Sequence, residues 1–157
     1  MPQEPDSISH EVVVPLSPPE AFRLFTHGFG SWWPQEYTWS ARVLESIDIE
    51  PFEPGLCTEE GPHRFRCDWG RVLVWTPPLR LVLAWQIGPH REPQPDPEKA
   101  STVELLFRPV EAGGTRLLLT HRDLRRHGRG ASRYRKALAG EGGWPLILGR
   151  YLEAAHG

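Results

Sequence analysis

Hydrophobic and polar residues alternate along several short segments of the chain, and this period of two is typical of β-strands with one buried face. In residues 8–14, for example, Ile8, Val12 and Val14 fall on one side of the segment. The same pattern predicts further strands at 40–50, 56–60, 65–75, 80–87, 102–108 and 115–122. The sequence therefore favours a sheet of about six or seven strands.

A period of three to four residues predicts helices elsewhere. Ser17 and Glu20 bracket two prolines, which is the signature of a helix N-terminus closed by a capping box. Short helices or turns are also expected at 31–37 and around 132–139. The last segment predicts a long amphipathic helix. Its apolar face consists of Trp144, Ile147, Leu148, Tyr151, Leu152 and Ala155.

The chain has 157 residues, 39% of them hydrophobic, with 17 Pro and 15 Gly. This length suits one domain, expected to span 1–157 with a flexible N-terminus at 1–7. So many helix-breaking residues argue against a helical bundle. An antiparallel sheet with one apolar face needs a cover. We therefore predict an α+β fold in which a curved antiparallel sheet wraps around the long C-terminal helix, with one or two short helices after the first strand.

Charge and motif content exclude several classes of protein. The net charge of −2 disfavours a nucleic-acid partner, and no apolar run reaches the ~20 residues of a membrane span. The polar N-terminus does not resemble a signal peptide, and the two cysteines, Cys57 and Cys67, form no motif, so a cytoplasmic location is expected. Phosphate-binding loops, dinucleotide motifs and metal-ligand spacings are absent from the sequence, so we expect no cofactor and no metal.

Tryptophan is abundant, and its positions suggest a binding site. Six of the seven tryptophans fall in segments with predicted structure, namely Trp32, Trp33, Trp69, Trp75, Trp85 and Trp144. Aromatic side chains from separate segments can line a cavity for a small molecule. They can equally fill a solid core. Tyr151, on the apolar face of the last helix, belongs to the same candidate set.

Two polar residues fall in phase with apolar ones. Glu45 shares a face with Val43 and Ile47, and His121 shares a face with Leu119. A buried carboxylate without a partner is costly, so one reading is that Glu45 and His121 pair inside the fold or contact a ligand. The other is that both lie near strand ends, where water reaches them.

Arg71 has the same parity as Trp69 and Leu73, which are expected to point inward. A bulge at Gly70 would reset the alternation and turn Arg71 outward. Alternatively, Arg71 points inward and pairs with an acid such as Glu59. An inward Arg71 would suit an anionic group on an apolar ligand.

Two polar segments have more than one interpretation. Residues 88–100 contain four prolines and are expected to form an extended, solvated loop, and whether this loop gates a cavity stays open. Residues 122–135 contain six arginines. They either attract an acidic partner or form a solvated loop beside a cavity mouth.

Several local strings together resemble the START-like (SRPBCC) superfamily with its helix-grip fold. Within it, the chain is similar to the group named after the C-terminal domain of the heat-shock-protein-90 ATPase activator. The resemblance covers about residues 9–155. The matching strings are VPLSPPEAF at 14–22, GSWWP at 30–34, DWGRVL at 68–73, LVLAW at 81–85, GTRL at 114–117 and GWP at 143–145. Relatives often carry two glycines and an aromatic residue before the acid aligned with Glu59, whereas this chain has PGLCTE at 54–59.

The resemblance implies a function as well as a fold. Members of the superfamily bind lipids, steroids, polyketides or hormones, and some are cyclases. The leading hypothesis is a monomer or homodimer that binds a small apolar or amphipathic molecule between the sheet and the C-terminal helix. One alternative is an interaction module with a chaperone partner. Another is a cyclase- or hydrolase-type enzyme that uses Glu45, His121 or Arg71, so whether the protein catalyses a reaction stays open.

Overall fold

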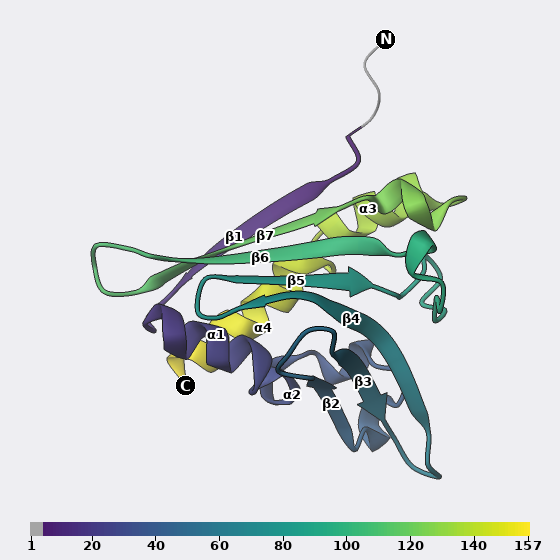
Figure 1. Ribbon diagram of the computed structural model, residues 1–157, viewed down its shortest axis with the longest axis horizontal. Coiled ribbons are helices and arrows are strands. Elements are labelled where there is room, and N and C mark those ends of the chain that lie inside the picture. The colour runs from purple at the N-terminus through teal and green to yellow at the C-terminus, as the bar shows by residue number, and fades with distance from the viewer. Residues whose placement is uncertain (1–4) are drawn as a thin grey trace.

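Figure 1 shows the computed structural model, which describes residues 5–157. All seven strands of this part of the chain belong to one antiparallel sheet, in the order β1-β7-β6-β5-β4-β3-β2. The strands are β1 Ile8–Val14, β2 Ser46–Ile49, β3 Leu56–Glu60, β4 Arg66–Thr76, β5 Arg80–Trp85, β6 Ser101–Pro109 and β7 Thr115–Arg122. The predicted α+β class and the predicted number of strands are confirmed.

The first helix, the short helix near 132–139 and the long C-terminal helix lie where the sequence predicts them. They are α1 Pro18–Thr26, α2 Phe29–Trp32, α3 Ala131–Ala139 and α4 Trp144–His156, with 3-10 turns η1 Gln35–Tyr37, η2 Ala41–Val43, η3 Pro97–Lys99 and η4 Leu124–His127. The sheet is curved, and α4 runs along one face of it, behind the strands in Figure 1. Among residues 5–157, no helix has both the length and the apolar character needed to cross a membrane.

The core lies between the sheet and helices α1, α2 and α4. At the start of α1, the Ser17 hydroxyl accepts a hydrogen bond from the Glu20 backbone N–H at 3.4 Å, so the predicted capping box is present. The apolar face of α4 is buried, and the Tyr151 hydroxyl at its centre donates to the Ala21 carbonyl oxygen of α1 at 2.7 Å. This bond fixes the distance between the two helices on the inner face of the sheet.

The strand predicted at 40–50 is wrong over its first half. The segment begins with the 3-10 turn η2, in which Ala41 has a φ of 47°, and only β2 pairs with the sheet. Consequently Val43 is 58% exposed and Glu45 is also exposed. Side chains satisfy the backbone of this turn in place of a neighbouring strand: the Thr38 hydroxyl accepts from the Ala41 N–H at 2.9 Å. The alternation of apolar and polar residues does not reveal that side chains compete with a neighbouring strand for these backbone groups.

An irregularity in the register of β4 explains why Arg71 and Trp69 point to opposite faces of the sheet. Cys57 pairs with Gly70 and Thr58 with Asp68, so Trp69 is the extra residue of a bulge on β4. Trp69 and Val72 are therefore buried, whereas Arg71 is exposed. The structure thus contains the bulge beside Gly70 and not an inward Arg71.

A second register shift follows along β4. Val72 pairs with Leu83 and Val74 with Val82, so Leu73 has no partner on β5 and is 49% exposed. The expectation that Leu73 points inward is therefore wrong. After this shift Trp75 is half-buried and its ring contacts Phe22 of α1, with 5.1 Å between the ring centroids.

Candidate functional site

A cavity of about 250 Å³ lies at one end of the sheet, beneath α3 and the start of α4. Six of the side chains that line it are aromatic, and they come from segments far apart in the sequence. These are Trp33, Tyr37, Trp39, Trp69, Trp85 and Tyr134. Aliphatic residues including Ile47, Leu138 and Ile147 complete the wall. The cavity is therefore mostly apolar, as sites for small organic molecules are.

Flat aromatic rings form one wall of this cavity. Trp33 stacks on Phe29, with 4.8 Å between centroids and 22° between planes, and Trp69 stacks on the same ring at 5.2 Å and 18°. Trp33 and Trp69 are accordingly nearly parallel, at 6.2 Å and 15°. Trp85 meets Trp69 edge-on at 5.8 Å and 69°. The bulge at Trp69 matters here, because it turns that ring toward the cavity.

A hydrogen bond to the hydroxyl of Tyr134 on α3 holds Trp85 in place. The Tyr134 hydroxyl accepts from the Trp85 indole N–H at 2.9 Å and donates to the Ile87 carbonyl oxygen at 2.9 Å. Burial raises the pKa of Tyr134, so this hydroxyl stays neutral. Because the Tyr134 O–H already donates to the Ile87 carbonyl oxygen, it is not available to donate to a ligand. The role of Tyr134 is therefore to position Trp85.

Glu59 of β3 is the acidic group of the cavity wall, and its residue surface is only 1% exposed. One carboxylate oxygen accepts from the Trp39 backbone N–H at 3.0 Å, and the other accepts from the Ser40 N–H at 2.7 Å. Within residues 5–157 no ion pair neutralises this carboxylate. Since an ionised carboxylate has about four acceptor positions, Glu59 retains acceptor capacity for a bound molecule.

Three segments meet at the mouth of the cavity. The Trp39 indole N–H donates to the Arg91 carbonyl oxygen at 2.7 Å, and the Tyr37 hydroxyl donates to the Gly142 carbonyl oxygen at 2.7 Å. The Arg91 guanidinium lies over the Tyr37 ring, 5.0 Å from its centroid. The proline-rich segment 88–100 thus contributes Pro89 and Arg91 to the cavity wall.

Behind the cavity, a chain of hydrogen bonds runs through the buried side chains of His121 and Ser101. The Trp144 indole N–H donates to His121 Nδ1 at 3.0 Å. Ser101 Oγ lies 2.7 Å from His121 Nε2 and 2.7 Å from His127 Nε2. Because an indole N–H can only donate, a neutral His121 carries its proton on Nε2 and donates to Ser101, which in turn donates to His127. Burial lowers the pKa of His121 to about 3, so the ring is neutral near pH 7.

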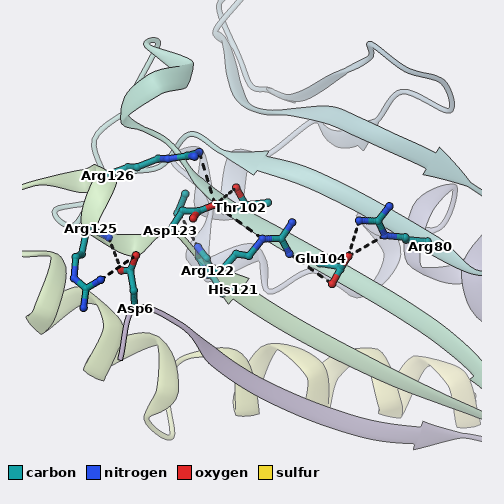
Figure 2. A network of polar contacts seen from close by, with 10 residues as sticks. Asp6, Arg80, Thr102, Glu104, His121, Arg122, Asp123, Arg125 and Arg126 are labelled. Atoms are coloured by element: carbon teal, nitrogen blue, oxygen red, sulfur yellow. Dashed lines mark hydrogen bonds and ion pairs between the residues drawn. The ribbon is translucent and has the colours of Figure 1, made fainter. Parts of the chain in front are cut away.

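The arginine-rich segment 122–135 carries much of its charge in ion pairs. Figure 2 shows Glu104 between Arg80 and Arg122, with nitrogen–oxygen distances of 2.8 and 3.5 Å. Asp123 accepts from the Thr102 hydroxyl at 2.9 Å and lies 3.7 Å from an Arg126 nitrogen. Arg80, Glu104 and Arg122 belong to the interior strands β5, β6 and β7, and none of the residues in this network lines the cavity.

The structure divides the predicted site residues into three groups. Trp33, Glu59, Trp69 and Trp85 line the cavity. Trp32, His121, Trp144 and Tyr151 are buried in the core around it, and Trp75 borders a separate surface depression beside His27. Arg71 and Glu45 are exposed and lie outside the cavity, so the reading in which Glu45 pairs with His121 is wrong. The alternative, that water reaches both residues, holds for Glu45 but not for His121, which is fully buried.

Among the cavity residues that sequence reasoning missed are the four with aromatic or charged side chains: Tyr37, Trp39, Arg91 and Tyr134. Each lies in a loop, a 3-10 turn or a short helix, where no periodicity indicates which way a side chain points. The sequence did offer one sign of these residues, because Trp39 is the only tryptophan left out of the candidate set. In the described part of the chain, no group of three His, Cys, Asp or Glu side chains could hold a metal ion.

The chain matches a known protein family and is similar to a solved structure over nearly its whole length. The sequence pattern of the family described as Activator of Hsp90 ATPase homolog 1-like protein matches residues 15–157. An anthrahydroquino-γ-pyrone synthase, Txn09, is 36% identical, with a TM-score of 0.66 over 98% of this chain and 99% of the synthase. No curated protein sequence matches.

Two more distant structures share the fold. The self-sacrificing resistance protein CalC from Micromonospora echinospora is 22% identical, with a TM-score of 0.66 over 95% of this chain and 93% of CalC. The Aha1 dimer from Colwellia psychrerythraea is 14% identical, with a TM-score of 0.63 over 95% of each chain. At these identities the likeness concerns the fold alone.

Proposed function

Because this chain belongs to the Activator of Hsp90 ATPase homolog 1-like family, a group with the START-like, helix-grip fold, we propose that it binds a small molecule in the cavity beside α4. The ligand is a flat, largely apolar aromatic compound. The observation that carries this proposal is the ring arrangement, in which the near-parallel Trp33 and Trp69 and the edge-on Trp85 line the same cavity.

The size of the cavity limits the ligand. An apolar cavity of about 150 Å³ accommodates benzene, so 250 Å³ suits two fused six-membered rings. A larger ring system would extend through the mouth past Arg91. Aromatic ligands gain from such walls because offset and edge-to-face contacts add to the burial of apolar area.

The relative at 36% identity supports an aromatic ligand. That protein is named as a synthase of an anthrahydroquino-γ-pyrone, which is a fused-ring compound. The similarity extends over nearly the whole of both chains, so the two proteins share the segments that build the cavity.

Mass spectrometry tests the proposal directly. The purified protein is measured under native and denaturing conditions, and we expect a non-covalent adduct that is lost on denaturation and absorbs in the near ultraviolet. If the native mass equals that of the chain, the protein is titrated with 2-naphthol while tryptophan fluorescence is followed. Absence of both an adduct and saturable quenching would contradict the proposal.

A second candidate function is catalysis on the bound molecule. The relationship to a synthase favours it, and Glu59 would serve as a general base toward a ligand proton. Deletion of the gene in its host, followed by mass spectrometry of aromatic metabolites, separates the candidates. An enzyme predicts that a precursor accumulates while its product disappears. A binding protein predicts the same compounds in changed amounts.

The chaperone-cofactor alternative rests on the description of the family. The Aha1 dimer is only 14% identical to this chain. A likeness at that level concerns the fold and gives no support to a chaperone partner. We therefore retain the small-molecule proposal as the better supported one.

A further inference from the structure

We infer that the cavity is polarised along its length, with a carboxylate at the buried end and a guanidinium at the mouth. It would therefore select an aromatic ligand that carries a hydrogen-bond donor, such as a phenol, at one end and an anionic group, such as a carboxylate, at the other. This inference rests on the proposed function and specifies the substrate class of the same site.

The charges that line the cavity are few and separated. Among its lining residues only Glu59 and Arg91 are charged. Glu59 is 1% exposed, whereas Arg91 is exposed to solvent. Glu59 is therefore the buried charge of this apolar space and Arg91 the solvent-exposed one, and a ligand that reaches both has only one orientation that places complementary groups against them.

The inner end favours donors and rejects anions. Both oxygens of Glu59 already accept backbone N–H groups, one from Trp39 and the other from Ser40. A ligand hydroxyl or amine N–H can occupy a remaining acceptor position. A ligand carboxylate at the same place would meet a like charge in a poorly hydrated space, which costs affinity.

At the outer end Arg91 is held with its charge over the mouth. Its backbone is in the left-handed region, with a φ of 63°, and its carbonyl oxygen accepts from the Trp39 indole N–H. The guanidinium carbon lies over the Tyr37 ring, 5.0 Å from its centroid, and no ion pair involves the guanidinium within residues 5–157. Its N–H donors are therefore not committed to an acidic side chain of this part of the chain and are available for a ligand carboxylate.

Four naphthalenes that differ only in their end groups test this inference on the unaltered protein. They are 6-hydroxy-2-naphthoate, 2-naphthoate, 2-naphthol and 2-methylnaphthalene, each titrated by tryptophan fluorescence at pH 7. We expect 6-hydroxy-2-naphthoate to bind at least tenfold more tightly than 2-methylnaphthalene, with the two singly substituted compounds between them. The carboxylate contribution should weaken as salt is raised from 20 to 300 mM, about as expected for a partly exposed charge pair.

The variant Arg91→Gln tests the outer end, with Arg71→Gln as the matched control, because Arg71 is exposed outside the cavity. We expect Arg91→Gln to weaken binding of the two naphthoates about fivefold or more and to leave 2-naphthol within twofold. Arg71→Gln should leave all four affinities unchanged. Glutamine avoids the β-branching that a left-handed residue tolerates poorly.

The outcomes separate the inference from the proposed function. If all four compounds bind within threefold of each other, or if Arg91→Gln weakens 2-naphthol as much as the naphthoates, the inference is overturned while aromatic binding stands. If none of the four binds, both fail. A preference for 2-naphthoate over 6-hydroxy-2-naphthoate would also overturn it, because Glu59 would then not accept from the ligand.

Discussion

Trp144 donates its indole N–H to Nδ1 of His121 across 3.0 Å, and both side chains are buried. This bond ties the first turn of α4 to β7. It also orients Trp144, whose ring lies 5.3 Å from that of Trp85 in the cavity wall. His121 thus acts on the candidate site through the tryptophans and not by contact with the cavity.

The first prediction concerns replacement of His121 by alanine. The change leaves the Trp144 N–H and the Ser101 hydroxyl without their buried partner and creates a void, so the free energy of unfolding should fall by about 2–4 kcal/mol. Urea denaturation followed by tryptophan fluorescence measures it. His90→Ala, in an exposed loop position, should change stability by less than about 0.5 kcal/mol. Equal stability of the two variants would contradict the role assigned to His121.

The second prediction is a pH dependence of stability. Burial lowers the pKa of His121 from 6.5 to about 3 in the folded state. In the unfolded chain the ring binds a proton below about pH 6.5, so the unfolded state binds more protons between pH 6.5 and 3. This group's contribution is therefore complete above pH 6.5 and is lost as the pH falls, by about 1.4 kcal/mol per pH unit. Wild type should lose more stability between pH 7.5 and pH 5 than His121→Gln, measured by urea denaturation at both values.

The third prediction separates two tryptophans that the sequence does not distinguish. Trp33→Ala removes a cavity wall and should weaken 2-naphthol binding at least tenfold, because the ligand loses a flat ring contact. Trp75→Ala should leave that affinity within twofold, since Trp75 lies against Phe22 at a different depression. Fluorescence titration or calorimetry measures both. A similar loss in the two variants would mean that binding occurs elsewhere or follows general destabilisation.

The fourth prediction concerns Tyr134→Phe. Loss of the hydroxyl leaves the buried Trp85 indole N–H unpaired, which should lower the free energy of unfolding by about 1–3 kcal/mol. Tyr37→Phe removes a hydroxyl that bonds to the Gly142 carbonyl oxygen at an exposed position, and it should cost less than about 1 kcal/mol. Thermal denaturation of both variants checks the difference. A larger effect at Tyr37 would show that the mouth, and not the Trp85 anchor, carries the stability.

The alternation of apolar and polar residues predicts a strand correctly where one face of the strand is buried and the other is not. The bounds of β1 and β7 match the prediction because more buried and less buried positions alternate along both strands, although Val13 and Leu118 are apolar residues on the less buried side. Alternation fails where other interactions compete with it. Thr38 and Glu59 bind the backbone of residues 39–41 and keep this stretch out of the sheet.

The candidate site was predictable only where its residues lie on strands or directly after a helix. Trp69 and Trp85 belong to β4 and β5, Trp33 follows α2, and all three line the cavity. Arg91 and Tyr134 could not be placed there in advance. Their positions depend on which distant segment meets which, and hydrogen bonds that span about fifty residues determine this.

The two hydrogen bonds at the mouth have a consequence for kinetics. Trp39 and Tyr37 each fasten a different distant segment, at Arg91 and Gly142, so a molecule that exceeds the width of the mouth must break both bonds to enter or leave. The bonds re-form behind it, so they slow association and dissociation alike and leave the equilibrium nearly unchanged. A ligand of the proposed class would therefore exchange slowly even where its affinity is modest.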